Sequence, residues 1–323
     1  MACGSYSPAY GLDLRPRRTY QTVGCRARSE CLRPLARLGR DRFEEGNDQL
    51  MTDKIITSRD NALVKHARAV RNGKVRDQIF VEGVRLCEDA TQALNVDDIH
   101  DVIYTERIAG ESRGAELISA LKIFSKRVAI VSEPIFASIS DTKTPQGIIL
   151  LAARPTTERS SLMTSASKVP LVVILHRINN PSNAGAILRT AEAAGASAAI
   201  LTEGTTDIFS PKALRGAMGS SFRLPLWTGA QFREALTWCK ERGISTISSD
   251  PHAGRTYTEI DWTWPSCLVV GAEAAGLSTD EKTQADVTVR IPMRPPVESL
   301  NVAVATAVVL YEAVRQRNVG SGQ

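Results

Sequence analysis

The sequence predicts an α/β protein in which a small α/β domain precedes a second domain built on a parallel sheet. Short apolar runs alternate with helix-like stretches from Ile55 onward, as in chains whose strands alternate with helices. Residues 171–175, LVVIL, are continuously apolar, which is typical of a strand buried within a parallel sheet. Residues 154–169 are rich in Ser and Thr and lack periodicity, so we expect them to link the two domains.

The front domain is expected to cover residues 51–153. Its first helix should follow Asp60, a residue type that caps helices, because apolar side chains recur at helical spacing over residues 62–70. A strand at 79–83 and a helix at 84–94 should come next. Three more apolar runs predict strands at 101–105, 128–131 and 148–151.

The second domain is expected to cover residues 170–318 and to begin with the strand at 171–175. Helical spacing predicts helices at 184–194, 232–242 and 300–317. Strands are predicted between them at 198–201, 244–248, 267–270 and 287–291. Such alternation favours a parallel sheet with helices on its faces.

The composition is that of a soluble globular protein. Of 323 residues, 43% are hydrophobic and 23% are charged, and no run of eighteen apolar residues predicts a membrane span. The six cysteines form no CxxC pair and the four histidines show no metal-ligand spacing, so we expect no metal site and a cytoplasmic, reducing location. His176 ends an apolar strand and is expected to be structural. The net charge of +5 permits nucleic-acid binding.

Residues 1–50 differ from the remainder of the chain. They contain nine Arg, no Lys and six acidic residues, with no sustained apolar period. We expect a poorly ordered extension, since such a segment buries little surface. Either an organelle transit segment or a mis-assigned start upstream of Met51 would explain it.

Three polar, glycine-containing clusters follow predicted strands of the second domain. They lie at residues 179–189, at 270–277 and at 291–305. Each has a structural explanation of its own, because Asn183 or Ser299 could cap a helix and the glycines could only form turns. In a parallel sheet, however, ligands bind outside the carboxyl ends of the strands, so we expect the three clusters to meet in one pocket.

The clusters also carry a family resemblance. The segments NNPSNAGAILRTAEAAG, VVGAEAAGLS and IPMRPPVESLNVAVATA resemble, in order and roughly in spacing, the three motifs of the SpoU (TrmH) class of SPOUT methyltransferases. Residues 55–152 are similar to the L30e-like substrate-binding domain that many of these enzymes carry in front. The resemblance implies an RNA 2′-O-ribose methyltransferase that uses S-adenosylmethionine, has a trefoil-knotted catalytic domain, and forms a homodimer.

The resemblance also implies roles for individual residues. By motif position, the catalytic arginine falls on Arg189, and its polar partners are Asn183, Glu273, Ser299 and Asn301. The implied cofactor contacts are Gly271, Gly276, Ile291, Met293 and Leu300. The family's arginine is proposed to deprotonate the ribose hydroxyl. A guanidinium normally stays charged, and our alternative is that Arg189 anchors the neighbouring phosphate and stabilises the alkoxide.

A basic cluster in the front domain is suited to RNA phosphates. Between Asp53 and Asp77, seven basic residues stand against three acids. The residues expected to bind RNA are Arg59, Lys65, Arg68, Arg71 and Arg76, and the alternative is a solvated helix face. The favoured substrate is ribosomal RNA of the 23S type. The alternatives are transfer RNA and a noncatalytic RNA-binding role.

Overall fold

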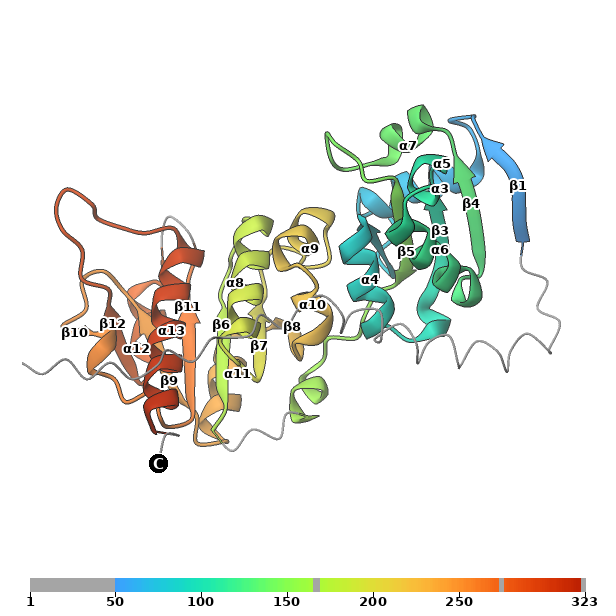
Figure 1. Ribbon diagram of the computed structural model, residues 1–323. Helices are drawn as coiled ribbons and strands as arrows, with labels where there is room; N and C mark the ends of the chain where they lie inside the picture. The colour runs from blue at the N-terminus through green and yellow to red at the C-terminus, as the bar shows by residue number, and fades with distance from the viewer. Residues whose placement is uncertain (1–49, 165–168, 273–275, 321–323) are drawn as a thin grey trace, which may run out of the picture. The chain divides into compact units, whose positions relative to one another are not determined.

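The computed structural model describes residues 50–164, 169–272 and 276–320, whose helices and strands are shown in Figure 1. The predicted extension at residues 1–50 therefore falls almost wholly outside the described residues. Two sheets organise the chain, one formed by residues 50–153 and the other by residues 171–290.

The first sheet is mixed. Its strands are β1 (Leu50–Ile56), β2 (Gln78–Glu82), β3 (Ile99–Tyr104), β4 (Arg127–Val131) and β5 (Ile148–Ala153), in the order β1-β4-β3-β5-β2. β1, β4 and β3 run parallel, whereas β5 is antiparallel to both β3 and β2. The helices around this sheet are α3 (Ala62–Arg71), α4 (Val84–Ala93), α5 (Glu106–Ala109), α6 (Ser112–Phe124) and α7 (Glu133–Ile139), with a 3-10 turn η1 (Val96–Asp98).

Helix α3 packs its apolar side chains against this sheet. Leu63, Val64 and Ala67 are buried in one cluster with Phe80 and Phe136. The prediction that Asp60 caps the helix is wrong by one residue. The Asn61 side chain accepts the Leu63 backbone N–H at 2.9 Å, and Asp60 instead forms an ion pair with Lys65.

The second sheet is parallel throughout. Its order is β10 (Arg255–Thr256), β12 (Val287–Arg290), β9 (Ser245–Ser249), β11 (Ser266–Val270), β6 (Leu171–Leu175), β7 (Ala198–Thr202), β8 (Leu226–Ala230). Its helices are α8 (Pro181–Ala193), α9 (Pro211–Ala217), α10 (Ser220–Arg223), α11 (Phe232–Lys240), α12 (Thr279–Gln284) and α13 (Val302–Gly320), with 3-10 turns η2 (Arg159–Thr164) and η3 (Tyr257–Glu259). The predicted α/β class is confirmed, and the trefoil knot stays a prediction.

Apolar strand residues supply the core of this second sheet. Val172 and Ile174 of β6 pack in one cluster with Trp238 and Cys239 of α11. Alternate residues of a strand point to opposite faces, so Val173, also fully buried, faces away from that cluster. In Figure 1, α8 and α13 run side by side, and they contact each other extensively.

The segment expected to link the domains is docked on the second sheet. Leu162, within η2, is buried in the same core cluster as Trp227 of β8. The Thr157 and Thr228 hydroxyls are 2.6 Å apart, and the Thr228 N–H donates to the Thr157 carbonyl. Part of the predicted linker is therefore ordered by packing.

Candidate active site

A cavity of about 750 Å³ lies where the loops after β6, β9, β11 and β12 come together. All four loops follow the carboxyl ends of their strands, as expected for a ligand site on a parallel sheet. Eight of the ten predicted catalytic and cofactor-binding residues line the cavity: Asn183, Gly271, Gly276, Ile291, Met293, Ser299, Leu300 and Asn301. The three sequence clusters thus contribute to one pocket, as expected.

The first and third clusters are joined by a hydrogen bond. The Asn301 Nδ2 donates to Asn183 Oδ1 at 3.2 Å. Asn301 Oδ1 in turn accepts the backbone N–H of Ala303 at 2.9 Å and so caps α13. Asn180, whose side chain accepts the Ser182 N–H, caps α8. The capping roles considered for Asn183 and Ser299 therefore belong to Asn180 and Asn301.

The second cluster is a tight turn whose backbone forms part of the cavity wall. A Cβ on Gly271 would lie 2.7 Å from both the Gly276 carbonyl carbon and the Leu277 nitrogen, so only glycine fits there. Gly276 has φ of +61° and donates its N–H to the Ala272 carbonyl at 2.9 Å. Glu273 falls between these two glycines in the sequence and lies outside the described residues.

The loop after β12 supplies the apolar part of the lining. Ile291 and Met293 are half-buried, and Leu300 is 39% exposed. Apolar side chains with backbone groups between them suit a flat heterocycle such as adenine. Ser299 is exposed beside Leu300 and adds a hydroxyl.

Two charged residues of the lining were missed from the sequence. Asp250, at the end of β9, forms an ion pair with Lys282 of α12. Burial raises the pKa of Asp250, but the Lys282 ammonium and the His252 backbone N–H outweigh that effect and hold the pKa below its ordinary value. The position of Asp250 directly after a predicted strand is the signal that could have identified it.

A buried histidine connects the end of β7 to helix α12. His176 Nε2 lies 3.0 Å from Glu281 Oε1, and its Nδ1 lies 2.9 Å from the Thr202 hydroxyl. Glu281 also caps α12 through Ser278, whose N–H donates to Oε2 at 2.8 Å. Burial lowers the pKa of His176 despite Glu281, so the ring is neutral at pH 7. The expectation of a structural histidine is confirmed.

Arg189 does not line the cavity. Its side chain is exposed on α8, six residues or nearly two turns after Asn183. The structure thus keeps the predicted arginine on the helix that carries Asn183 but outside the pocket of this chain. Arg189 is left pointing into solvent, where a bound macromolecule can reach it.

The basic cluster of the front domain divides into two groups. Arg71 donates to the Ile139 and Ser140 carbonyls at 3.1 and 3.0 Å, and Arg68 donates to the Ser138 hydroxyl. Both guanidiniums therefore satisfy the carbonyl end of α7. The remaining members, Arg59, Lys65 and Arg76, are exposed, and Lys65 pairs with Asp60.

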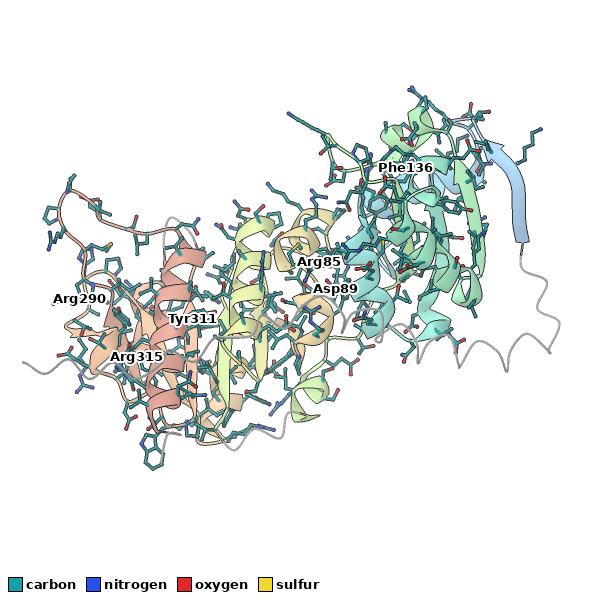
Figure 2. All side chains as sticks on the ribbon, in the orientation of Figure 1. Arg85, Asp89, Phe136, Arg290, Tyr311 and Arg315 are labelled. Carbon is teal, nitrogen blue, oxygen red and sulfur yellow. The ribbon has the colours of Figure 1, made fainter. Side chains whose placement is uncertain are left out.

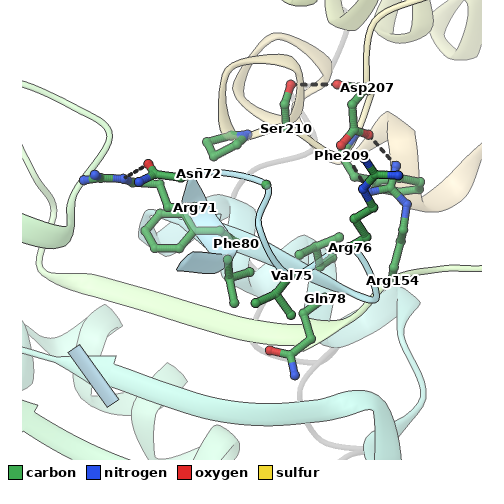
Figure 3. Close-up of a pocket in the computed structure, with 14 residues that line it drawn as sticks. Arg71, Asn72, Val75, Arg76, Gln78, Phe80, Arg154, Asp207, Phe209 and Ser210 are labelled. Atoms are coloured by element: carbon green, nitrogen blue, oxygen red, sulfur yellow. Dashed lines mark hydrogen bonds and ion pairs between the residues drawn. The ribbon is translucent and has the colours of Figure 1, made fainter. Parts of the chain in front are cut away.

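A second cavity of about 550 Å³ is shown in Figure 3. Arg154 pairs there with Asp207, and its guanidinium lies 4.9 Å from the ring centre of Phe209. Arg71 and Arg76 also line it. Asp207 pairs with Arg154, and Arg71 donates its hydrogen bonds to the end of α7. Arg76 is the third cation of this lining, and no ion pair to it is seen among the described residues.

Two features are absent from the described residues. Within residues 50–164, 169–272 and 276–320, no group of three or more His, Cys, Asp or Glu side chains is placed to hold a metal ion. In the same part of the chain, no helix has the length and apolar character needed to cross a bilayer.

Comparison with known proteins covers both sheets. Residues 170–311 match the model of the SpoU rRNA Methylase family, and residues 61–150 match the model of the MRM3-like substrate binding domain. An uncharacterized tRNA/rRNA methyltransferase of Synechocystis is 33% identical over 265 residues, which are 81% of this chain and 94% of that protein. The 23S rRNA (guanosine(2553)-2′-O)-methyltransferase RlmP of Bacillus subtilis is 29% identical over 262 residues, 80% of this chain and 98% of that protein.

A solved structure gives the same result. The SpoU methyltransferase AviRb of Streptomyces viridochromogenes, in complex with AdoMet, has a TM-score of 0.72 and 28% identity. The similarity covers 81% of this chain and 100% of that one.

Proposed function

The chain belongs to the SpoU rRNA methylase family, and from this membership we propose that it methylates a ribose of large-subunit ribosomal RNA. It is an S-adenosylmethionine-dependent RNA 2′-O-ribose methyltransferase. RlmP, which aligns over almost its whole length, is a 23S rRNA methyltransferase, and this supports a substrate of the same class. A cytoplasmic location belongs to the same proposal.

One observation carries the proposed site: the Asn183–Asn301 hydrogen bond at the edge of the cavity. It joins residues from two clusters that are 118 positions apart. Amide and hydroxyl groups of Asn183, Ser299 and Asn301 can hold a ribose hydroxyl by hydrogen bonds without placing a strong anion there. We assign substrate positioning to these three residues.

The cavity fits the cofactor chemically. Its volume lies within the usual range for small-molecule sites, and its lining combines apolar side chains with the backbone of the Gly271–Gly276 turn. When bound, S-adenosylmethionine supplies an activated methyl group. Ile291, Met293 and Leu300 would flank its adenine, and the turn would contact it through backbone groups.

The chain's own contribution to the reaction is alignment and charge. Transfer to an oxygen requires the acceptor to approach in line, and holding two groups in that geometry supplies a large part of the rate. Arg189, charged and exposed near Asn183, is proposed to bind the phosphate next to the target nucleotide. From there the guanidinium would stabilise the negative charge that develops on the ribose oxygen.

The front domain is proposed to hold the RNA, with residues 51–153 as its extent. Arg59, Lys65 and Arg76 are the exposed members of its basic cluster and are the better candidates for phosphate contact. RNA contact by Arg68 and Arg71 stays a prediction. These two side chains already form hydrogen bonds at the end of α7, which RNA phosphates would have to replace.

We further propose a homodimer that forms through α13. Val304 and Tyr311 are 51% and 52% exposed, and their spacing of seven residues places them on one face of the helix. Tyr311 is labelled in Figure 2. Large apolar side chains aligned on a helix face favour coverage by a partner, and a second copy of the chain is the one proposed.

The substrate is tested by mapping 2′-O-methylation across total RNA from cells with and without the gene. The proposal expects one methylated position to disappear from large-subunit ribosomal RNA and to return with the wild-type gene but not with Asn183→Ala. A lost position in transfer RNA would replace the proposed substrate. If methylation were complete in cells without the gene, and the purified protein still bound RNA, the noncatalytic role would be favoured.

A further inference from the structure

The cavity carries a pair of opposite charges at one place in its lining. Asp250 and Lys282 both line it and are paired with each other, and the lining among the described residues contains no other Asp, Glu, Lys or Arg. The Asp250 side chain is 10% exposed and that of Lys282 is 31% exposed. Neither charge is needed to bind adenine or a ribose ring.

Both charges are held in place by other contacts. The His252 backbone N–H donates to Asp250 Oδ1 at 2.7 Å and orients the carboxylate. Lys282 follows Glu281, which is fixed by His176 at 3.0 Å and by the Ser278 N–H at 2.8 Å. The pair therefore connects the loop after β9 to helix α12 in the cavity lining, and contacts around both residues hold it in place.

The cofactor assigned to this cavity ends in an amino acid, which has one ammonium and one carboxylate. Burying such a zwitterion requires an anion and a cation nearby, since an unpaired charge is expensive to remove from water. A ligand zwitterion can insert beside an existing ion pair, with each end facing the opposite charge. Asp250 then faces the ammonium and Lys282 faces the carboxylate.

We propose that the Asp250–Lys282 pair recognises the amino-acid end of the cofactor. This inference rests on the proposed cofactor site, and it deepens that site by naming two residues that the sequence motifs do not contain. It gives the pair a specificity role: the enzyme distinguishes ligands that carry the amino-acid group from adenosine thioethers that lack it.

The test compares two ligands that differ only at that end. S-adenosylhomocysteine has the amino-acid group, whereas 5′-methylthioadenosine keeps the adenosine and the sulfur without it. Affinities of both would be measured by titration calorimetry for the wild-type chain, Asp250→Asn and Lys282→Met. Controls are Asp280→Asn, an exposed acid on the same helix, and Lys240→Met, an exposed lysine on α11.

Each cavity variant should weaken the affinity for S-adenosylhomocysteine by about tenfold or more, as expected for the loss of a charged hydrogen bond. The affinity for 5′-methylthioadenosine should change by less than about twofold. Both controls should leave both affinities unchanged. If folded variants lost affinity for both ligands equally, the proposal would be overturned. The pair would then contact the ribose or hold the loop in place. Thermal melting checks that each variant is folded, and Asp250→Ser replaces Asp250→Asn if the latter does not fold.

The same titrations separate this inference from the function it rests on. Wild-type protein that binds S-adenosylhomocysteine supports the cofactor site, whatever the variants do. Wild-type protein that binds neither ligand would reject the cofactor site, and the proposed subsite with it.

Discussion

Asn301 Nδ2 donates a 3.2 Å hydrogen bond to Asn183 Oδ1, and Asn301 Oδ1 accepts the Ala303 N–H and so caps α13. The Asn301 amide thus links two of the clusters and caps the start of α13. The two functions are separable, because Asn183 takes part only in the first. This separation allows a direct test of the proposed site.

Replacing either asparagine should slow methyl transfer, but the loss of Asn301 should weaken the fold more, because only Asn301 caps a helix. Asn301→Ala loses the cap and should reduce the free energy of unfolding by about 1 kcal/mol. Asn183→Ala leaves that cap in place and should therefore reduce the free energy of unfolding by less than Asn301→Ala does. Both should lower kcat by about tenfold or more through loss of alignment. Urea unfolding and single-turnover kinetics measure the two effects, and wild-type kcat in Asn183→Ala would argue against the assigned role.

Gly185 illustrates how a residue inside a motif can be required for packing. A Cβ there would lie 2.3 Å from the Ala213 carbonyl oxygen and 2.8 Å from the Ala217 nitrogen, because α8 and α9 cross closely. Gly185→Ala should therefore destabilise the protein by about 1–3 kcal/mol, the usual range for overpacking. Gly254→Ala is the matched control, since a Cβ there meets nothing within 4 Å. Equal melting temperatures for the two variants would contradict this account.

The elements that the sequence predicted are those with a strong apolar period. The strand at 171–175 was found because LVVIL is apolar at every position, and the long last helix because its apolar residues recur over many turns. Helix α12, TDEKTQ, has no apolar period, so it was not predicted, and Lys282 was missed with it. β8, LWTGA, is short and contains a glycine, which weakens the strand signal.

The site was predicted as a set of residues, without their contacts. Strand ends in a parallel sheet brought Asn183, Gly271 and Asn301 together by topology alone. The hydrogen bond between the two asparagines depends on where α13 crosses α8, and side-chain packing rather than local sequence decides that crossing. For the same reason the sequence could not show that Arg71 is committed to the end of α7.

The front-domain arginines should separate into RNA-binding and structural classes. Arg59→Ala and Arg76→Ala should each weaken RNA binding. Each should also reduce the slope of log affinity against log salt concentration by about the amount that one phosphate contact contributes. Neither should change the melting temperature. Arg71→Ala should lower the melting temperature, because the carbonyls at the end of α7 lose their donors. The expected loss in the free energy of unfolding is about 1–3 kcal/mol.

The controls for this comparison are an exposed arginine elsewhere and a full salt series. Arg233→Ala, on α11, removes the same charge from another surface and should leave RNA affinity unchanged. Filter binding at several salt concentrations gives both the affinity and its slope. If Arg233→Ala weakened binding as much as Arg76→Ala, net charge rather than the front domain would account for the effect.

Charged substitutions on α13 should dissociate the proposed dimer. Val304→Lys or Tyr311→Glu would bury a charge in the interface, which should weaken self-association by about tenfold or more. Light scattering coupled to gel filtration measures the mass at several concentrations. Trp264→Lys is the control, since Trp264 is 69% exposed and lies outside α13. A wild-type chain that is monomeric at all concentrations would reject the proposal.

Glu312 should make α13 sensitive to acid. The Arg315 guanidinium, together with Gln316, lowers the pKa of Glu312 to about 2 from an ordinary value of 4.5, although burial opposes them. A carboxylate with a lower pKa in the folded state contributes stability that is fully present above the unfolded value. That contribution is lost as the pH falls from about 4.5 toward 2.

The measurement is the difference in the free energy of unfolding between the wild type and Glu312→Gln at pH 7 and at pH 3.5. All other carboxylates are common to both proteins, so their titration cancels in this difference. Because Gln does not ionise, the wild type should lose part of its advantage over the variant as the pH falls from 7 to 3.5. A difference that stays constant with pH would mean that the Glu312–Arg315 pair contributes no charge-dependent stability.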